Sequence, residues 1–237
     1  GKSVLMASIN LASCIKSGIE VIPYITYLDI GPSSRYFVEL MRDSLPDEQR
    51  HLATAIKFRM SRDYAVNVFD TQLGFRHPLP AEKSFLVDFL TQLATPAERT
   101  TPYDSMSTLA GKVIDEAYRI FADTTKSKPK VYVRGIRPEI DALLDNHHYY
   151  PGRGEPWWCI VDFLFEKGYT HEAYVAQRYA VPTLEDIAAV AQEPSISDLY
   201  RNVTVDTGEP LNAAFSRLLA DSVRDFPVLS CETRFDV

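Results

Sequence analysis

Several features that would assign this chain to a common class of protein are missing from its sequence. The chain has three cysteines, Cys14, Cys159 and Cys231. They lie far apart and form no CxxC pair, so we expect a reducing cytoplasm rather than a disulfide framework. No apolar run reaches the roughly 18 residues that a membrane span needs. The apolar run near the N-terminus is interrupted by polar residues and lacks a small-residue cleavage site, so a signal peptide is not expected.

An excess of positive charge is also missing. The chain has 25 Lys and Arg against 32 Asp and Glu, a net charge of −7, with a pI of about 5.3. Because neutralising phosphates requires Lys and Arg, direct nucleic-acid binding by this region is not expected. The one basic cluster is "KSKPKVYVRGIR", which we interpret as a solvated loop, with an anionic partner as the alternative. Its charged residues are Lys126, Lys128, Lys130, Arg134 and Arg137.

Motifs for nucleophilic and metal-dependent catalysis are absent as well. No G-x-S-x-G occurs, and no Cys/His pair has a supporting context. The stretch "DNHHYYPGRGEPWWC" contains His147, His148 and Cys159, but a zinc site needs four ligands at close spacing. We therefore interpret this stretch as an aromatic-rich turn that packs between helices.

The first hundred residues alternate between helix and strand patterns, which predicts an α/β fold with a mostly parallel sheet. The helix expected near residues 3–16 is apolar on nearly every side, so we expect it to be buried between layers. Runs rich in β-branched and aromatic residues predict strands at 21–31, 54–60 and 64–69. Further helices are expected at 32–45 and 81–94.

From Thr100 onward the pattern becomes mostly helical. One short strand at 131–136 and an extended segment starting at 232 are the exceptions that we expect. The chain is therefore predicted to divide into an α/β part, residues 1–99, and a helical part, residues 100–237. The helices of the second part are expected at 105–123, 137–145, 157–167, 171–178, 183–192, 195–202 and 209–224.

The chain opens on a tripeptide with chemical meaning. Gly1, Lys2 and Ser3 match the end of the phosphate-binding loop G-x-x-x-x-G-K-[ST], whose amides cradle phosphates, whose lysine reaches the β- and γ-phosphates, and whose hydroxyl holds Mg²⁺. The helix that such a loop requires follows directly. Ligands of parallel sheets bind beyond the carboxyl ends of strands, so Asp29, which ends the predicted strand "YLDIG", is expected near the nucleotide. The first glycine of the loop and the strand before it are expected upstream.

Three stretches resemble one family of ATPases. They are "GKSVLMASINLA", "YLDIGPSSRYFVELM" and "VNVFDTQLGFRHPLPAEKSFLVDFLTQLATP". They are similar to the IcmB (DotO) and TraU type of ATPase from type IVB secretion and conjugation systems, which is related to the HerA–FtsK group of hexameric RecA-like motors. The resemblance covers residues 1–98 well and the remainder more loosely. "FDTQLGFR" is its most specific part and GKS its least specific.

The resemblance implies a partial RecA-like P-loop core followed by a helical insertion domain. It also implies a cytoplasmic hydrolase, peripheral at the inner membrane, that forms hexamers and contacts other secretion-system components. ATP and Mg²⁺ are the implied cofactors. By the family's motif, Lys2 and Ser3 are the phosphate and Mg²⁺ ligands, and the amides of Gly1 to Val4 cradle the β-phosphate.

Hydrolysis also requires an acidic residue at the end of a strand, and "KVIDEAYRIF" offers Asp115 and Glu116. Leu109, Val113 and Ala117 recur every four residues there, which predicts a helix with both acids on its solvated flank. We therefore expect the Walker B strand beyond residue 237 and no ATP hydrolysis by residues 1–237 alone. The alternative is a non-enzymatic interaction module in which GKS is accidental; a small-molecule kinase would need a lid with converging arginines, which we do not identify.

Overall fold

The structure is a computed structural model of the chain. It describes residues 2–15, 23–26, 33–57, 59–124 and 127–234, and of residues 2–4, 15, 33 and 34 it describes the backbone alone. By the density of their internal contacts the residues form two units, Gly1–Phe58 and Arg59–Asp236. We call them unit 1 and unit 2 and describe each by itself. The predicted boundary at residue 99/100 falls within unit 2, between two of its helices.

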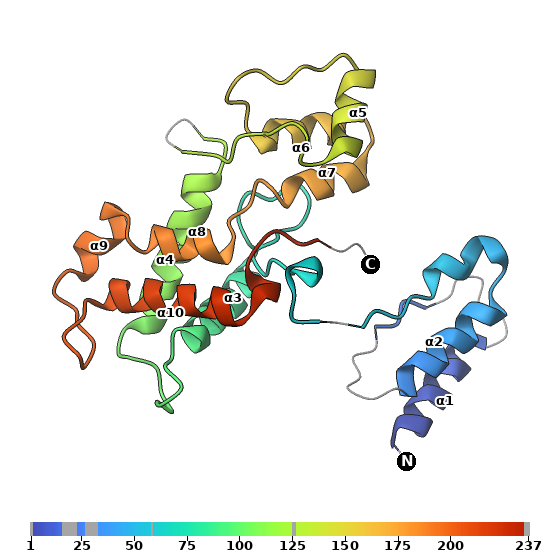
Figure 1. Cartoon of the computed structure of the whole chain (residues 1–237), viewed down its shortest axis with the longest axis horizontal. Helices are drawn as coiled ribbons and strands as arrows, with labels where there is room; N and C mark the ends of the chain where they lie inside the picture. Colours follow the sequence, from blue (N-terminus) through green and yellow to red (C-terminus); the bar gives the residue numbers. More distant parts are fainter. Residues whose placement is uncertain (1, 16–22, 27–32, 58, 125–126, 235–237) are drawn as a thin grey trace. The chain divides into compact units, whose positions relative to one another are not determined.

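Unit 1 contains helices α1 (Lys2–Ile15) and α2 (Ser33–Ser44) and the 3₁₀ helix η1 (Asp47–Leu52). Helix α1 packs along α2 (Figure 1). The expectation that α1 is buried between layers is wrong for its described side chains, because Leu5, Met6 and Ile9 are 62%, 46% and 50% exposed.

The predicted parallel sheet is not present among the described residues. These residues form helices, turns and two isolated bridges, Val131 with Pro156 and Thr204 with Pro210. The α/β class and the partial RecA-like sheet are therefore wrong for this part of the chain. Of the strand predicted at 21–31, only residues 23–26 are described, and they have no regular secondary structure.

The segment at 64–69 shows why the strand prediction failed. Ala65, Asn67 and Phe69 are buried and alternate with partly exposed residues, as in a half-buried strand. A strand also requires a partner strand. Here the neighbours of the segment are helices and a C-terminal segment that makes two backbone hydrogen bonds with it, too few for a ladder. Alternation of buried and exposed residues indicates that one side of a segment is buried. It does not indicate whether a strand or a helix covers that side.

The helix predictions are confirmed. Proline at the first helical position begins α3, α5 and α9, and a Thr183–Asp186 capping box begins α8. Unit 2 also contains the short 3₁₀ helices η2 (Arg62–Tyr64) and η3 (Pro227–Leu229). Its α-helices are α3 (Pro80–Leu93), α4 (Met106–Phe121), α5 (Pro138–Asn146), α6 (Trp157–Glu166), α7 (Thr170–Gln177), α8 (Leu184–Val190), α9 (Pro194–Tyr200) and α10 (Leu211–Asp225).

The described residues of unit 2 form two hydrophobic cores. The main core lies between α3, α4, α8, α9 and α10 and includes the fully buried Leu109, Ile114 and Phe215. The second core lies between α5, α6 and α7 and is centred on Ile140, Trp158 and other buried residues. Figure 1 shows α5, α6 and α7 grouped at one end of the unit and α3, α8 and α10 at the other.

Candidate functional site

The structure leaves the predicted phosphate site untested. Lys2, Ser3 and Val4 lie in the first turn of α1, but their side chains are not described. Gly1 and Asp29 lie outside the described residues. The contacts of these five residues with ATP and Mg²⁺ therefore stay predictions.

The acidic pair in "KVIDEAYRIF" lies on a helix, as predicted. In α4, Asp115 is exposed and forms an ion pair with Lys83 at 2.5 Å. Glu116 accepts hydrogen bonds from Arg119 and Ser195, and the bond from Arg119 is the main reason that the pKa of its carboxyl is lowered. The two carboxylates belong to the polar flank of the helix, so this segment is not a Walker B strand.

The aromatic-rich stretch is part of the second core. Trp157 and Trp158 are buried, and Tyr149 stacks on Phe163 with ring centroids 4.2 Å apart. Burial raises the pKa of the Cys159 thiol, which disfavours the reactive thiolate. Across the part of the chain that the structure describes, no cluster of three or more metal-binding side chains occurs. The aromatic end of the stretch packs in the second core, as predicted, but Trp157 and Trp158 lie on α6, and Tyr150 is 69% exposed.

The basic cluster is largely neutralised within the chain. Lys130 pairs with Asp186 at 2.7 Å, and Arg134 and Arg137 pair with the acidic side chains of Asp145 and Glu139. Lys128 is exposed, and Lys126 lies outside the described residues. This arrangement favours the solvated loop, because a cation that already has an acidic partner is a weaker ligand for an external anion.

A network of hydrogen bonds with buried polar side chains surrounds the stretch "FDTQLGFR", residues 69–76, which we call the FDTQLGFR segment. Gln177, at the end of α7, is 2% exposed and inserts its amide into this segment. The amide nitrogen donates to the carbonyls of Thr71 and Gln72 at 3.0 and 2.9 Å. Its oxygen accepts the N–H of Gly74 at 2.8 Å. One side chain thus binds the backbone of three residues in a segment without regular secondary structure.

Arg76 connects the same segment to both cores. Its guanidinium donates to Asp123 at 3.0 Å, just beyond α4, and to Asp162 of α6 at 2.6 Å. It also lies over the ring of Trp158, 4.3 Å from the centroid. The hydrogen bond from Arg76 is the main reason that the pKa of Asp123 is lowered. Arg76 therefore links the helices of the main core to the helices of the second core.

Asp70 is the most perturbed carboxyl of the region. Burial raises its pKa to about 6, although a hydrogen bond from Thr233, the charge of Arg178 and a hydrogen bond from Asn67 act in the opposite direction. Thr233 donates to Asp70 at 2.6 Å and Asn67 donates at 3.3 Å. The carboxyl is thus held in place by neighbours from three separate parts of the chain.

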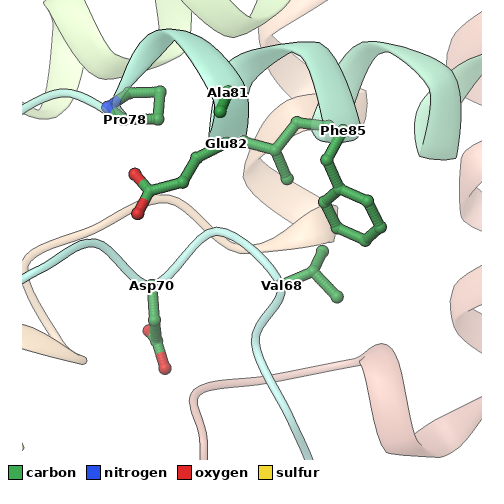
Figure 2. A pocket seen from close by; sticks show the side chains of 7 residues that line it. Val68, Asp70, Pro78, Ala81, Glu82 and Phe85 are labelled. Atoms are coloured by element: carbon green, nitrogen blue, oxygen red, sulfur yellow. The ribbon is translucent and has the colours of Figure 1, made fainter.

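A shallow hollow lies between this segment and the start of α3. Its volume is about 370 Å³. Figure 2 shows the ring of Phe85 facing Val68, the carboxylate of Glu82 beside the opening, and the carboxylate of Asp70 turned away from α3. Glu82 accepts the N–H of Leu79 at 2.7 Å and so caps α3. Apolar walls next to two carboxylates do not fit a triphosphate, so we do not interpret the hollow as a nucleotide pocket.

The residues that organise this region were not found from the sequence. Gln177 and Arg178 stand between apolar residues in "AYVAQRYA", and both are buried. Two polar residues at the end of an otherwise apolar helix stripe are the only signal that could have identified them. Thr233 gave no signal, because the partners of its hydroxyl are more than 160 positions away.

No helix among the described residues has the length and apolar character needed to cross a bilayer. Comparison with protein-family models, curated proteins and solved structures finds no match for this chain. The likeness to the secretion ATPases therefore depends on the quoted stretches alone.

Proposed function

We propose that this chain is part of an ATPase that powers substrate translocation by a type IVB secretion or conjugation apparatus. The observation that carries the proposal is the position of the GKS tripeptide: Lys2 and Ser3 occupy the first turn of α1. In a phosphate-binding loop the same residue types occupy the first turn of a helix, where free amides and the helix dipole favour an anion.

The proposed roles follow from the chemistry of each group. Lys2 neutralises charge on the γ-phosphate, the hydroxyl of Ser3 is a hard oxygen ligand suited to Mg²⁺, and the amides up to Val4 donate to the β-phosphate. Mg²⁺ held by the hydroxyl of Ser3 would supply Lewis-acid stabilisation of the negative charge on the phosphates. Gly1 and Asp29 complete the proposed set.

The surface of unit 1 supports a role within a larger assembly. Leu5 and Ile9 of α1 and Tyr36 and Leu40 of α2 are each at least half exposed. Several exposed large apolar side chains on two packed helices are a feature that contact with another polypeptide would cover. Hexamer formation, contact with other secretion components and a peripheral position at the inner membrane are proposed from the resemblance.

The proposal is tested by nucleotide binding to the natural polypeptide that carries this sequence. We expect a fluorescent ATP analogue to bind in the presence of Mg²⁺, and Lys2→Ala to weaken binding at least about tenfold through loss of a charged phosphate contact. Lys112→Ala removes an exposed lysine of unit 2 and serves as the matched control. Ser3→Ala is expected to abolish the Mg²⁺ dependence. Equal affinities for the Lys2 and Lys112 variants would leave the interaction module as the better hypothesis.

A further inference from the structure

The first and last described segments of unit 2 lie against each other. We call residues 62–70 the anchor segment and residues 227–234 the strap; in Figure 1 the strap is the dark red chain that follows α10. Their 3₁₀ helices η2 and η3 are in contact. Two backbone hydrogen bonds, of 2.8 and 3.0 Å, join them: Val66 N–H to the Val228 carbonyl, and Arg234 N–H to the Ala65 carbonyl.

Thr233 is the centre of the attachment. Its hydroxyl accepts the N–H of Asn67 at 2.9 Å and donates to Asp70 at 2.6 Å. Its carbonyl accepts a hydrogen bond of 3.4 Å from Arg178, which is 6% exposed at the end of α7. One strap residue is thus bound to the anchor segment and to the helices at the same time.

The strap contributes little to the hydrophobic cores. Val228 is its one buried apolar side chain among the described residues, and it belongs to neither core. Leu229 packs against the main core but is partly exposed. A segment held chiefly by hydrogen bonds near the surface opens at a lower free energy than the helices beneath it.

We propose that residues 227–234 are a releasable strap. Thr233 and Asp70 hold it against the anchor segment, and it detaches from that segment while the main core and the second core stay folded. When the strap is closed, the chain enters and leaves unit 2 at one place. When it is open, the two connections move independently of each other. The strap therefore determines whether residues 62–70 and 227–234 are held together or move independently of each other. This inference does not depend on the proposed ATPase activity.

The surroundings of Asp70 make the strap sensitive to pH. The charged and titratable groups that face it are Arg178, Glu232, Tyr118 and Tyr174. Its pKa is raised to about 6, chiefly by burial, whereas the hydrogen bond that Thr233 of the strap donates lowers it. Opening the strap changes both the burial of Asp70 and its hydrogen bond from Thr233, so the free energy of opening depends on pH around the pKa of this carboxyl.

Amide hydrogen exchange on the chain of residues 1–237 tests the proposal. Thr233→Val removes the hydroxyl, so the N–H of Asn67 loses its acceptor and the carboxylate of Asp70 loses a donor. We expect the amides of Val66, Asn67 and Arg234 to exchange about tenfold faster in this variant, while amides within α4 and α10 keep their rates. Thr207→Val, at an exposed position, is the matched control and should change none of these rates.

Asp70→Asn supplies the second measurement, because asparagine keeps an oxygen for Thr233 but carries no charge. Exchange at Val66 and Arg234, corrected for intrinsic rates, should change between pH 5 and pH 7.5 in the wild type and be independent of pH in this variant. Acceleration of the α4 and α10 amides by the same factor as the strap amides in Thr233→Val would overturn the proposal. Unchanged strap amides in Thr233→Val, or an equal pH dependence with and without Asp70, would overturn it as well.

Discussion

Replacing Gln177 tests whether one buried amide holds the FDTQLGFR segment in place. Gln177→Ala removes the donor to the carbonyls of Thr71 and Gln72 and the acceptor of the Gly74 N–H. Gln177→Glu keeps an acceptor for Gly74 but places a carboxylate oxygen against two carbonyls. We therefore expect the glutamate variant to be less stable than the alanine variant at neutral pH, although glutamate is closer in shape to the natural residue.

The expected size follows from the number of groups that lose a partner. Each buried polar group left unpaired costs about 1–3 kcal/mol, but Gly74 and Gln72 lie near the surface and can bind water. We expect Gln177→Ala to lower the free energy of unfolding by about 3 kcal/mol. With an m-value of about 2 kcal/mol per molar urea, the midpoint falls by about 1.5 M. The fluorescence of Trp157 and Trp158, both buried in unit 2, reports the transition.

Gln92→Ala is the matched control for this measurement. Gln92 is exposed in the last turn of α3, so its truncation should change the free energy of unfolding by less than about 0.5 kcal/mol. If Gln177→Ala were no more destabilising than Gln92→Ala, the amide would not support the segment. A glutamate variant as stable as the wild type would show that the donor role assigned to the amide nitrogen is wrong.

Two further predictions concern Arg76 and the main core. Arg76→Met removes hydrogen bonds to two carboxylates, so it should raise the pKa of Asp123, measured by NMR titration, and destabilise unit 2 by about 1–2 kcal/mol. Arg76→Lys should show smaller changes in both quantities, because lysine keeps the charge but lacks the planar fork of arginine. Phe215→Ala should cost about 3–5 kcal/mol in urea unfolding because its ring is fully buried in the main core, whereas Phe226→Ala, at a position 41% exposed, should cost under about 1 kcal/mol. Equal losses for the two phenylalanines would contradict the assignment of the core.

The helices could be predicted from the sequence because their signal is local. In α4, buried Leu109, Val113 and Ala117 repeat every four residues, and this stripe is complete within sixteen positions. The sheet could not be predicted reliably, because pairing is a property of two segments. The alternation from Ala65 to Phe69 is that of a strand, yet the chain supplies helices and the strap as its neighbours.

The polar network could not be predicted for a related reason. Gln177 meets Thr71 across 106 positions, and Asn67 meets Thr233 across 166. No periodicity or short motif encodes such distances in sequence. The resemblance to the secretion ATPases identified "FDTQLGFR" as unusual but gave no reason for its residue types, and the structure supplies one.

Each distinctive residue of the FDTQLGFR segment has a structural task. The hydroxyl of Thr71 donates to the carbonyl of Phe75 at 2.6 Å, Gly74 has a φ of 84° that favours glycine, and Arg76 joins the two cores. These requirements would hold in a protein without any catalytic activity. Likeness in this stretch is therefore an argument for a shared helical unit. The argument for ATP chemistry depends instead on Lys2 and Ser3, so the Lys2→Ala binding measurement decides a question that the most specific part of the resemblance cannot.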